Sequence, residues 1–345
     1  MEEISRIFVD TSKQLFQLHG VNAAEQVVVR RKLRRAQFLA FFAGMKPAVV
    51  GLEACAASHH WARELAGLGH EVRLIAPQHI KPYVKRNKND ARDAEAGCEA
   101  MSRPTMRFVP VKTVEQQAGL MLLKHRERLV AERTATSNAI RGHAAEFGWV
   151  VPTGLDKIPS LVAQAVEAPE VPETICKVFR QLDARFAQLQ AEIAELDREI
   201  AAWRRKSEVS LRLAALPGIG ELGSMMLPLK TPDPRGFKSG RDFAAWIGLT
   251  ARDHSTAGKL RLGVITKAGD EALRSVLVAG AMSAIRQVLL GRGRQWPWLV
   301  ELLKRKARKL AAVALANKLA RIAWKMMVSG ASYDPAKLGL SPMTA

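Results

Sequence analysis

Cysteine is scarce in this chain, and its three cysteines, Cys55, Cys98 and Cys176, stand singly with no C-x-x-C spacing. Isolated thiols argue against a disulfide framework and against a structural zinc site. The first residues carry acids and a strand-like pattern, where a signal peptide needs a basic and then an apolar run. The most apolar stretches, 276–285 and 310–316, are too short and too interrupted by polar residues to cross a bilayer. We therefore expect a cytoplasmic protein with no membrane partner.

Acidic residues are few relative to basic ones. The 345 residues include 53 Lys or Arg and 33 Asp or Glu, which gives a net charge of +20 and a pI near 10.3. This excess favours a polyanionic partner such as a nucleic acid, although a generic basic protein has the same composition. Apolar residues make up 48% and charged residues 25% of the chain, as in ordinary globular proteins. The length predicts two or three folding units.

The first part of the chain, residues 1–152, has the pattern of an α/β domain with a mixed or parallel sheet. The first three apolar runs are joined by short polar turns, which predicts an antiparallel meander. Short β-branched runs and helical periodicity together predict strands at 7–10, 16–21, 26–30, 48–53 and 71–76 and helices at 57–68 and 90–101.

The rest of the chain is expected to be all-α, with a central helical region at 153–206. A long helical pattern over 113–148 precedes two prolines, and beyond them apolar residues recur in alternating steps of three and four. The seam contains Phe179, Leu182, Phe186, Leu189, Ile193, Leu196, Ile200 and Trp203. This spacing predicts a coiled coil, which we expect to join subunits into a dimer or tetramer. A long helix packed within its own chain would show the same seam.

The third part, residues 207–345, is expected to be mainly helical. Its turn at 216–220 (LPGIG) can present backbone N–H groups to a phosphate, although Pro-Gly turns between helices are common without that role. Residues 286–325 carry a net charge of +10 and include Trp296, Trp298 and Trp324. We interpret this segment as an electrostatic surface for nucleic acid. The alternative is a solvated basic helix face with its tryptophans in the core.

Four acids from separate segments of the α/β domain suggest a metal site. Asp10 and Glu53 end predicted strands, and Asp90 and Asp93 lie three residues apart on one face of a predicted helix. Mg²⁺ prefers hard oxygen ligands and often shares them with phosphate. Two such ions can activate a nucleophile and stabilise the leaving oxygen of a phosphodiester. Taken singly, each acid is more often a turn, cap or ion-pair residue, so the prediction depends on the set.

A candidate nucleophile lies in the polar, glycine-bearing segment 250–266. Ser255 is followed by Thr256, Ala257 and Gly258, so we expect a loop with an exposed hydroxyl. A serine hydroxyl is a poor nucleophile unless cations or a metal stabilise the developing charge. An ordinary Ser-Thr turn is the alternative, and no G-x-S-x-G elbow points to acyl transfer. The cations that can supply this field or bind phosphate are Lys259, Arg261, Lys267 and Arg274.

The combined motifs resemble a known family, the insertion-sequence transposases with a RuvC-like DEDD domain and a C-terminal catalytic serine. The resemblance covers nearly the whole chain, and several ordered motifs are more specific than any one of them. The pieces are FVDTSK at Asp10, GLEAC at Glu53, KRNKNDARDAEA at Asp90 and Asp93, LPGIG at 216–220, FAAWIGLTARDHSTAGK at 243–259, and GVITKAGDEALRSVLVAGA at 263–281.

The resemblance implies an RNase H-like fold in which Asp10, Glu53, Asp90 and Asp93 bind Mg²⁺. It also implies that Ser255 attacks DNA and forms a phosphoserine intermediate. Many relatives have Ser-Gly at this point, and a register shifted by one would place Thr256 there instead. A structured non-coding bridge RNA is the implied guide to the element and target DNA. The alternatives are a metal-only junction-resolving nuclease and a non-catalytic nucleic-acid-binding protein.

The basic residues that we expect to bind nucleic acid lie in three segments. They follow the fifth predicted strand, occupy the serine-bearing segment and continue into the C-terminal helices. The complete set is Lys85, Arg86, Lys88, Lys259, Arg261, Lys267, Arg274, Lys304, Arg305, Lys306, Arg308 and Lys309.

Overall fold

A computed structural model describes residues 3–85, 89–169, 171–292 and 296–334. Two of the predicted nucleic-acid-binding residues, Arg86 and Lys88, lie outside these described residues. Backbone contacts divide the chain into two compact units, Met1–Val114 and Glu115–Ala345. Each unit is described by itself below. The finer domain boundaries at 152 and 206 stay predictions.

The first unit is built on a six-stranded mixed sheet with the strand order β3-β2-β1-β4-β5-β6. Its first three strands form the predicted antiparallel meander, and β1, β4 and β5 are parallel neighbours. This arrangement confirms the mixed sheet and is consistent with an RNase H-like domain. A short antiparallel edge strand, β6, was not predicted. The strands are β1 (Arg6–Thr11), β2 (Leu15–Val21), β3 (Val27–Arg34), β4 (Val49–Glu53), β5 (Glu71–Ile75) and β6 (Phe108–Val109).

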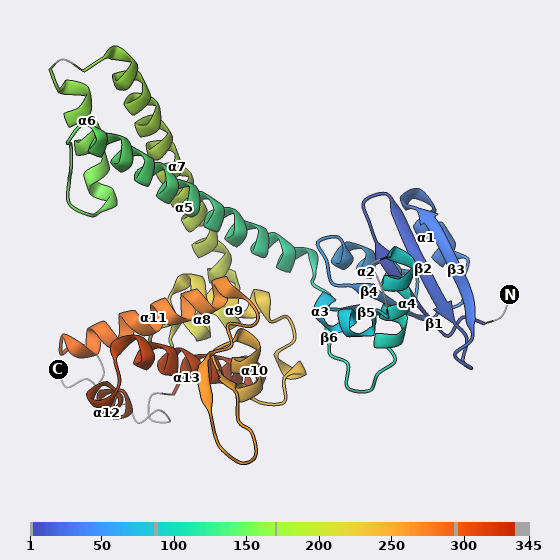
Figure 1. Ribbon diagram of the computed structural model, residues 1–345. Coiled ribbons are helices and arrows are strands. Elements are labelled where there is room, and N and C mark those ends of the chain that lie inside the picture. The colour runs from blue at the N-terminus through green and yellow to red at the C-terminus, as the bar shows by residue number, and fades with distance from the viewer. Residues whose placement is uncertain (1–2, 86–88, 170, 293–295, 335–345) are drawn as a thin grey trace. The chain divides into compact units, whose positions relative to one another are not determined.

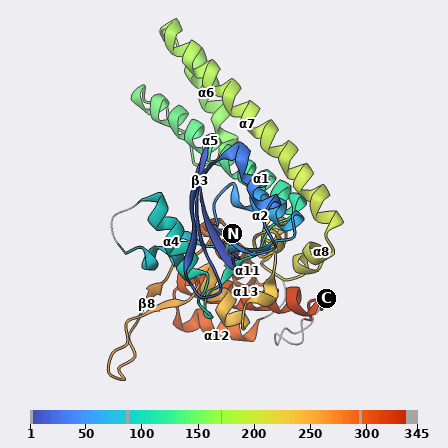
Figure 2. The same ribbon diagram turned by 90° about the vertical axis from the view of Figure 1, so that its right-hand side faces the viewer.

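Helices cover both faces of this sheet (Figure 2). On one face, α1 and α2 bury an aromatic cluster in which Phe38 meets Phe16 and Trp61 edge to face, with ring centroids 4.6 and 5.0 Å apart. On the other face, α4 packs so closely on β1 that a Cβ at Gly97 would lie 2.2 Å from the Phe8 ring. The helices are α1 (Phe38–Ala43), α2 (Ser58–Gly67), α3 (Pro77–Ile80) and α4 (Asp90–Ala100), with 3-10 turns η1 (Arg35–Gln37) and η2 (Lys81–Tyr83).

The second unit begins with two long helices, α5 (Val114–Glu146) and α7 (Glu173–Lys206), which lie side by side (Figure 1). The short helix α6 (Ile158–Glu167) and the turn η3 (Leu155–Lys157) connect them. Ion pairs between Arg126 and Asp197 and between Arg185 and Glu132 join the two long helices.

The predicted coiled-coil seam on α7 is buried inside the same chain. Leu189 and Ile193 pack against Leu129 of α5, and Phe179 and Phe186 pack in a cluster with α5 and α6. The structure therefore shows the alternative, a long helix packed within its own chain. The seam is already covered by apolar neighbours, so it gives no support to pairing between subunits, and the oligomeric state stays a prediction.

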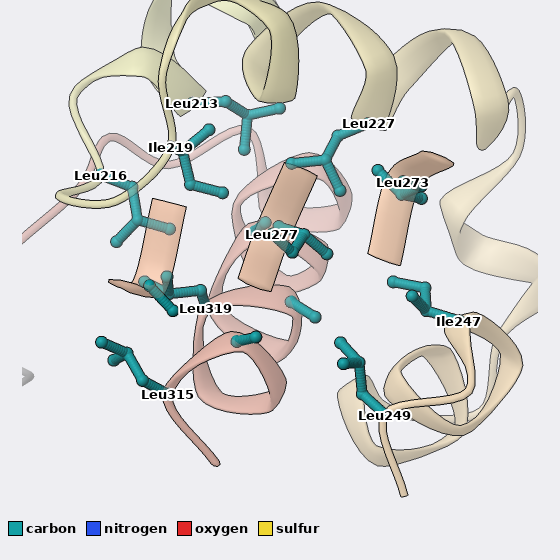
Figure 3. Packing of buried hydrophobic residues seen from close by; sticks show 14 of the residues in the cluster. Leu213, Leu216, Ile219, Leu227, Ile247, Leu249, Leu273, Leu277, Leu315 and Leu319 are labelled. Carbon is teal, nitrogen blue, oxygen red and sulfur yellow. The ribbon is translucent and has the colours of Figure 1, made fainter. Parts of the chain in front are cut away.

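Six further helices and a hairpin complete the second unit. Their core contains Leu213 from the helix at 208–214, Ile219 from the turn after it, Leu277 from α11 and Leu319 from α13 (Figure 3). The elements are α8 (Glu208–Ala214), α9 (Glu221–Lys230), η4 (Pro234–Gly236), α10 (Gly240–Ile247), β7 (Ala251–Asp253), β8 (Leu262–Ile265), α11 (Glu271–Leu289), α12 (Pro297–Arg305) and α13 (Arg308–Ser329).

The turn at 216–220 is packed against α11. Leu216 and Ile219 are buried, and Gly218 adopts a φ of +88° that favours glycine. A Cβ built on Gly280 would lie 1.8 Å from the Gly218 carbonyl oxygen, so two glycines allow the backbones to touch. The turn therefore has a clear packing role in this unit.

Helix α11 is long and apolar enough to span a membrane, the only such helix among the described residues. One helix of this kind is weak evidence, because the core helix of a soluble protein meets the same test. Leu273, Leu277, Ala281 and Ile285 of α11 are buried in the core of the unit.

Candidate active site

Asp10 and Glu53 are neighbours in the sheet of the first unit. Val9 pairs with Leu52 across the parallel strands β1 and β4, so the residue after each lies at the same level. Both side chains lie on the α4 face, because alternate residues of a strand face the same way and Phe8 and Gly51 meet on that face. The sheet therefore places these two predicted metal ligands on adjacent strands.

Helix α4 brings the other two acids to the same face. The Asn89 side chain caps the helix by accepting a hydrogen bond from the Ala91 amide at 3.0 Å. Asp90 and Asp93 lie in the first turn, where the positive end of the helix dipole stabilises carboxylates. Their three-residue spacing puts both on one side of the helix.

Three of the four predicted ligands meet. One carboxylate oxygen from each of Asp10, Asp90 and Asp93 lies within 4.8 Å of the others. Asp10 and Asp93 are half-buried, and Asp90 is exposed. Glu53 is not part of this group among the described residues, although it ends the strand beside Asp10. Hard oxygen donors at this spacing fit a divalent cation such as Mg²⁺, which would also relieve the repulsion among the three charges.

Ser255 lies in the exposed loop that was expected from the sequence, and this loop connects strands β7 and β8 of a hairpin in the second unit. Strands β7 and β8 pair across the segment, and the hairpin extends away from the helices (Figure 1). The Arg261 amide donates to Ser255 Oγ at 3.0 Å, and the Ser255 amide donates to Asp253 Oδ1 at 2.8 Å. Both Ser255 and Thr256 are exposed.

Asp253 contacts Ser255 and is a candidate site residue that the sequence reasoning missed. Hydrogen bonds from the Ser255 side chain and backbone hold the pKa of Asp253 below its ordinary value. The Asp253 carboxylate is therefore linked by hydrogen bonding to the residue that carries the candidate hydroxyl. The signal in the sequence was an acid two residues before the serine, a spacing that also occurs in ordinary Asx turns.

The predicted cations occupy different environments. On the hairpin and the segment after it, Lys259, Arg261 and Lys267 are exposed. Arg274 is instead buried, and its Nη1 donates to the backbone carbonyls of Ile247 at 3.0 Å and Ala268 at 2.9 Å. Its guanidinium is thus used inside the protein, and we do not retain Arg274 as a nucleic-acid ligand.

The remaining predicted cations are on the surface of their units. Lys85 is exposed and pairs with Glu95 at 3.5 Å, and Lys304 pairs with Glu301 at 2.6 Å. The other exposed members, at the end of α12 and the start of α13, are Arg305, Lys306, Arg308 and Lys309.

The tryptophans of this basic segment divide between core and surface. Trp296 is buried, and Trp324 donates its Nε1–H to the Pro234 carbonyl at 2.8 Å. Trp298 is 38% exposed and has Lys318 Nζ 4.4 Å from its ring centroid. The alternative that the tryptophans belong to the core therefore holds for Trp296, whereas Trp298 is partly exposed to solvent.

A second set of cations was missed in the first unit. Five of the six residues from Arg30 to Arg35 are Lys or Arg, and they occupy the exposed end of the edge strand β3 and the turn after it. The predicted strand at 26–30 included only Arg30 of this run, and no role was given to the other four cations. The run of charge was the available signal.

Acids clustered beside the central strands of a mixed sheet, in a strongly basic chain, are typical of metal-dependent enzymes that act on phosphodiesters. Comparison with known proteins agrees with this class. A model described as "Transposase IS116/IS110/IS902 family" matches residues 210–294, and the IS110-type DEDD transposase model matches residues 8–147.

Individual relatives match along nearly the whole chain. A "Putative transposase y4pF/y4sB" of Sinorhizobium fredii is 58% identical over 98% of this chain and 87% of its own length. A "Probable family 20 transposase" of Pseudomonas aeruginosa is 45% identical over 96% of this chain and 99% of its own. The "Transposase for insertion sequence element IS1111A" of Coxiella burnetii is 37% identical over 96% of this chain and 92% of its own length. The chain belongs to the IS110/IS116/IS902 family of insertion-sequence transposases, and it is therefore a DNA transposase.

Proposed function

We propose that this transposase cuts and joins DNA strands in a Mg²⁺-dependent reaction through a phosphoserine intermediate, guided by a structured non-coding RNA. In this proposal residues 1–152 supply the metal-binding acids, 153–206 form a helical linker and 207–345 carry the nucleophile. The observation that carries the proposal is the convergence of Asp10, Asp90 and Asp93 within 4.8 Å on one face of the sheet.

The acids have a defined task in this proposal. Asp10, Asp90 and Asp93 would hold the cation, and Glu53, which ends the neighbouring strand, would be a further ligand. When bound, Mg²⁺ supplies positive charge to the phosphate oxygens and the leaving oxygen. A neutral protein surface would leave the charge of the scissile phosphate unbalanced, whereas this acidic cluster recruits the cation to the place where it is needed.

Ser255 is the proposed nucleophile. A nucleophile must be accessible to DNA, and Ser255 is exposed on the hairpin. A bond forms between Ser255 Oγ and phosphorus, and the bond from phosphorus to the 3′ oxygen breaks. The proton lost by the serine is balanced by the proton gained by the 3′ oxygen, so the products are a 5′-phosphoserine and a free 3′ hydroxyl. Attack on the phosphoserine by the 3′ hydroxyl of another cut strand forms a new phosphodiester, breaks the bond from phosphorus to Ser255 Oγ and returns the proton to the serine, so strands are joined without a nucleotide cofactor. Asp253 orients the serine hydroxyl through its hydrogen bonds.

The metal is tested first by thermal unfolding. Adding Mg²⁺ or Mn²⁺ should raise the unfolding temperature of the wild type, because a ligand that binds only the folded state stabilises it. Asp10→Asn should abolish that increase. Glu71→Gln, which alters an acid on β5 outside the cluster, is the matched control and should keep it. An equal response of Asp10→Asn and the wild type to the metal would contradict the proposed site.

The serine is tested with labelled element-junction DNA, Mg²⁺ and the transcribed non-coding flank of the element. The wild type should give DNA that stays attached to protein after denaturation. Ser255→Ala should give none, while Thr256→Ala should retain the attachment. Loss in Thr256→Ala alone would move the nucleophile by one residue. Free cut ends without attached DNA in the wild type would instead indicate a metal-only nuclease.

The RNA partner is supported by the net charge of +20, which suits a protein that carries RNA and DNA together. Base pairing by the RNA would select the sequence, and the protein would bind shape and backbone. Transcripts of the flanking non-coding DNA should bind more tightly than a scrambled RNA of equal length and should be required for strand cleavage. Cleavage of naked junction DNA at the same rate without RNA would overturn this part of the proposal.

A further inference from the structure

The basic run on β3 lies on the same sheet as the acidic cluster, and its side chains alternate between the two faces. Arg31 lies over the Phe41 ring at 5.5 Å, and Arg35 lies over the Trp61 ring at 4.7 Å. Both aromatic residues belong to the face covered by α1 and α2. Since alternate residues of a strand point to opposite faces, Arg30, Lys32 and Arg34 are on the α4 face.

The pairing register connects these cations to the acidic cluster. Asp10 of β1 is directly opposite Gln17 of β2, and Gln17 is directly opposite Lys32 of β3. Neighbouring strands are about 4.8 Å apart, so Lys32 lies about 10 Å from Asp10 along one row of the sheet. Arg30 and Arg34 flank Lys32 on the same strand.

A cleft of about 250 Å³ lies between this part of the sheet and the first turns of α4. It is lined by Gln17, His19 and Arg30 from the strands and by Asn89, Arg92 and Glu95 from the helix. Among the described residues, Arg30, Lys32 and Arg34 form no ion pair, so their charges are not neutralised within the protein. The row therefore contains three cations that form no ion pair among the described residues, and one of them, Arg30, lines the cleft.

We propose that Arg30, Lys32 and Arg34 form a phosphate-binding row that holds the DNA strand next to the phosphate at the acidic cluster. This inference rests on the proposed function for the identity of the strand. The occupant is argued from charge: three cations on one face of an edge strand match the repeating charge of a nucleic-acid backbone. Without a cation the acidic cluster would repel that backbone, and the positive charges of the row would offset this repulsion.

The test compares two double variants of the full-length protein. Arg30→Gln with Lys32→Gln removes two charges from the α4 face, and Arg31→Gln with Arg35→Gln removes two from the opposite face. Glutamine keeps much of the apolar stem, so stacking over Phe41 and Trp61 is retained in the control. Thermal unfolding confirms that both variants are folded. The readout is the affinity for a fluorescent single-stranded oligothymidylate over a range of salt concentrations.

Each lost phosphate contact on a single strand should lower the salt slope by about 0.7, so the α4-face variant should lose about 1.4. Between about 50 and about 200 mM salt, the wild type should lose affinity by a factor that is about seven times the factor lost by this variant. The opposite-face control should keep the wild-type slope. Equal slope changes in both variants would overturn the proposal, because they would indicate only long-range attraction.

Two further arms separate the possible causes of failure. An oligouridylate probe is titrated in parallel, and a slope change confined to RNA would overturn the assignment to the DNA strand. When Asp10→Asn is added to each double variant, the response to metal should be lost while the difference in slope between the two double variants persists. Measuring the salt slope needs no cleavage. If the wild type showed no response to metal while the two double variants still differed in salt slope, the catalytic proposal would be refuted and the phosphate-binding row would be established.

Discussion

The contact between Gly218 and Gly280 gives a sharp test of how the second unit is packed. Replacing Gly280 with alanine adds one methyl group to the interior of α11. Its Cβ would lie 1.8 Å from the Gly218 carbonyl oxygen and 2.9 Å from the carbonyl carbon. Backbone atoms cannot rotate away as a side chain can, so the turn and the helix must separate by more than about 1 Å.

The expected magnitude combines two opposing terms. Overpacking costs about 1–3 kcal/mol, and the upper end applies here because the clash is with backbone. Alanine in a helix interior is favoured over glycine by about 1 kcal/mol. We therefore expect Gly280→Ala to lower the free energy of unfolding by about 2 kcal/mol. The unfolding temperature should fall by about 4–8 °C for a unit of this size.

Gly142→Ala is the matched control in the same unit. Gly142 lies in the interior of α5, is exposed, and has no atom within 4 Å of the position where a Cβ would be. The Gly142→Ala variant gains the helix preference of alanine over glycine, about 1 kcal/mol, without a clash. Its unfolding temperature should therefore rise by about 2–4 °C.

Tryptophan fluorescence is the assay, because six of the seven tryptophans lie in the second unit. The unfolding temperatures of the wild type and both variants are compared under the same conditions. If Gly280→Ala proved as stable as Gly142→Ala, the close approach of the turn to α11 would be refuted.

Two further predictions concern buried polar groups. Burial first, and then the charges of Lys112 and Arg63, lower the pKa of His59 from 6.5 to about 4. The folded state therefore binds this proton less readily than the unfolded state. The contribution of His59 to the free energy of unfolding is constant above pH 6.5 and falls as the pH drops towards 4. An NMR titration of the imidazole that gave an ordinary pKa would contradict this prediction. Arg274→Ala should lower the free energy of unfolding by about 3 kcal/mol, because it leaves the Ile247 and Ala268 carbonyls without their donor. Its salt slope for DNA should remain that of the wild type, and a reduced slope would restore Arg274 as a phosphate ligand.

Strands β1 to β5 and helices α2 and α4 of the first unit were predictable because each carries its own local signal, whereas α1, α3 and the edge strand β6 were not predicted. The run RIFVDT buries Ile7, Phe8 and Val9 and then reaches Asp10, and the sequence 90–101 has acids in its first turn as helices prefer. These patterns identified the four acids and the exposed serine as candidates. They depend only on near neighbours in the chain, so no tertiary information was needed.

Contacts between distant segments were decided by the tertiary structure. The apolar spacing on α7 is the same whether the partner is another subunit or α5, and only the fold shows Leu189 packed on Leu129. The charge of Arg274 suggested phosphate binding, but its burial directs the guanidinium to two carbonyls.

The cations of β3 became informative only through strand pairing. Asp10 and Lys32 are far apart in the sequence, and the register of three strands places them on one row and one face. A sequence specifies which residues are apolar, charged or small in each segment. Which segments meet is set by packing the whole core at once, because each buried face is satisfied by residues distant along the chain.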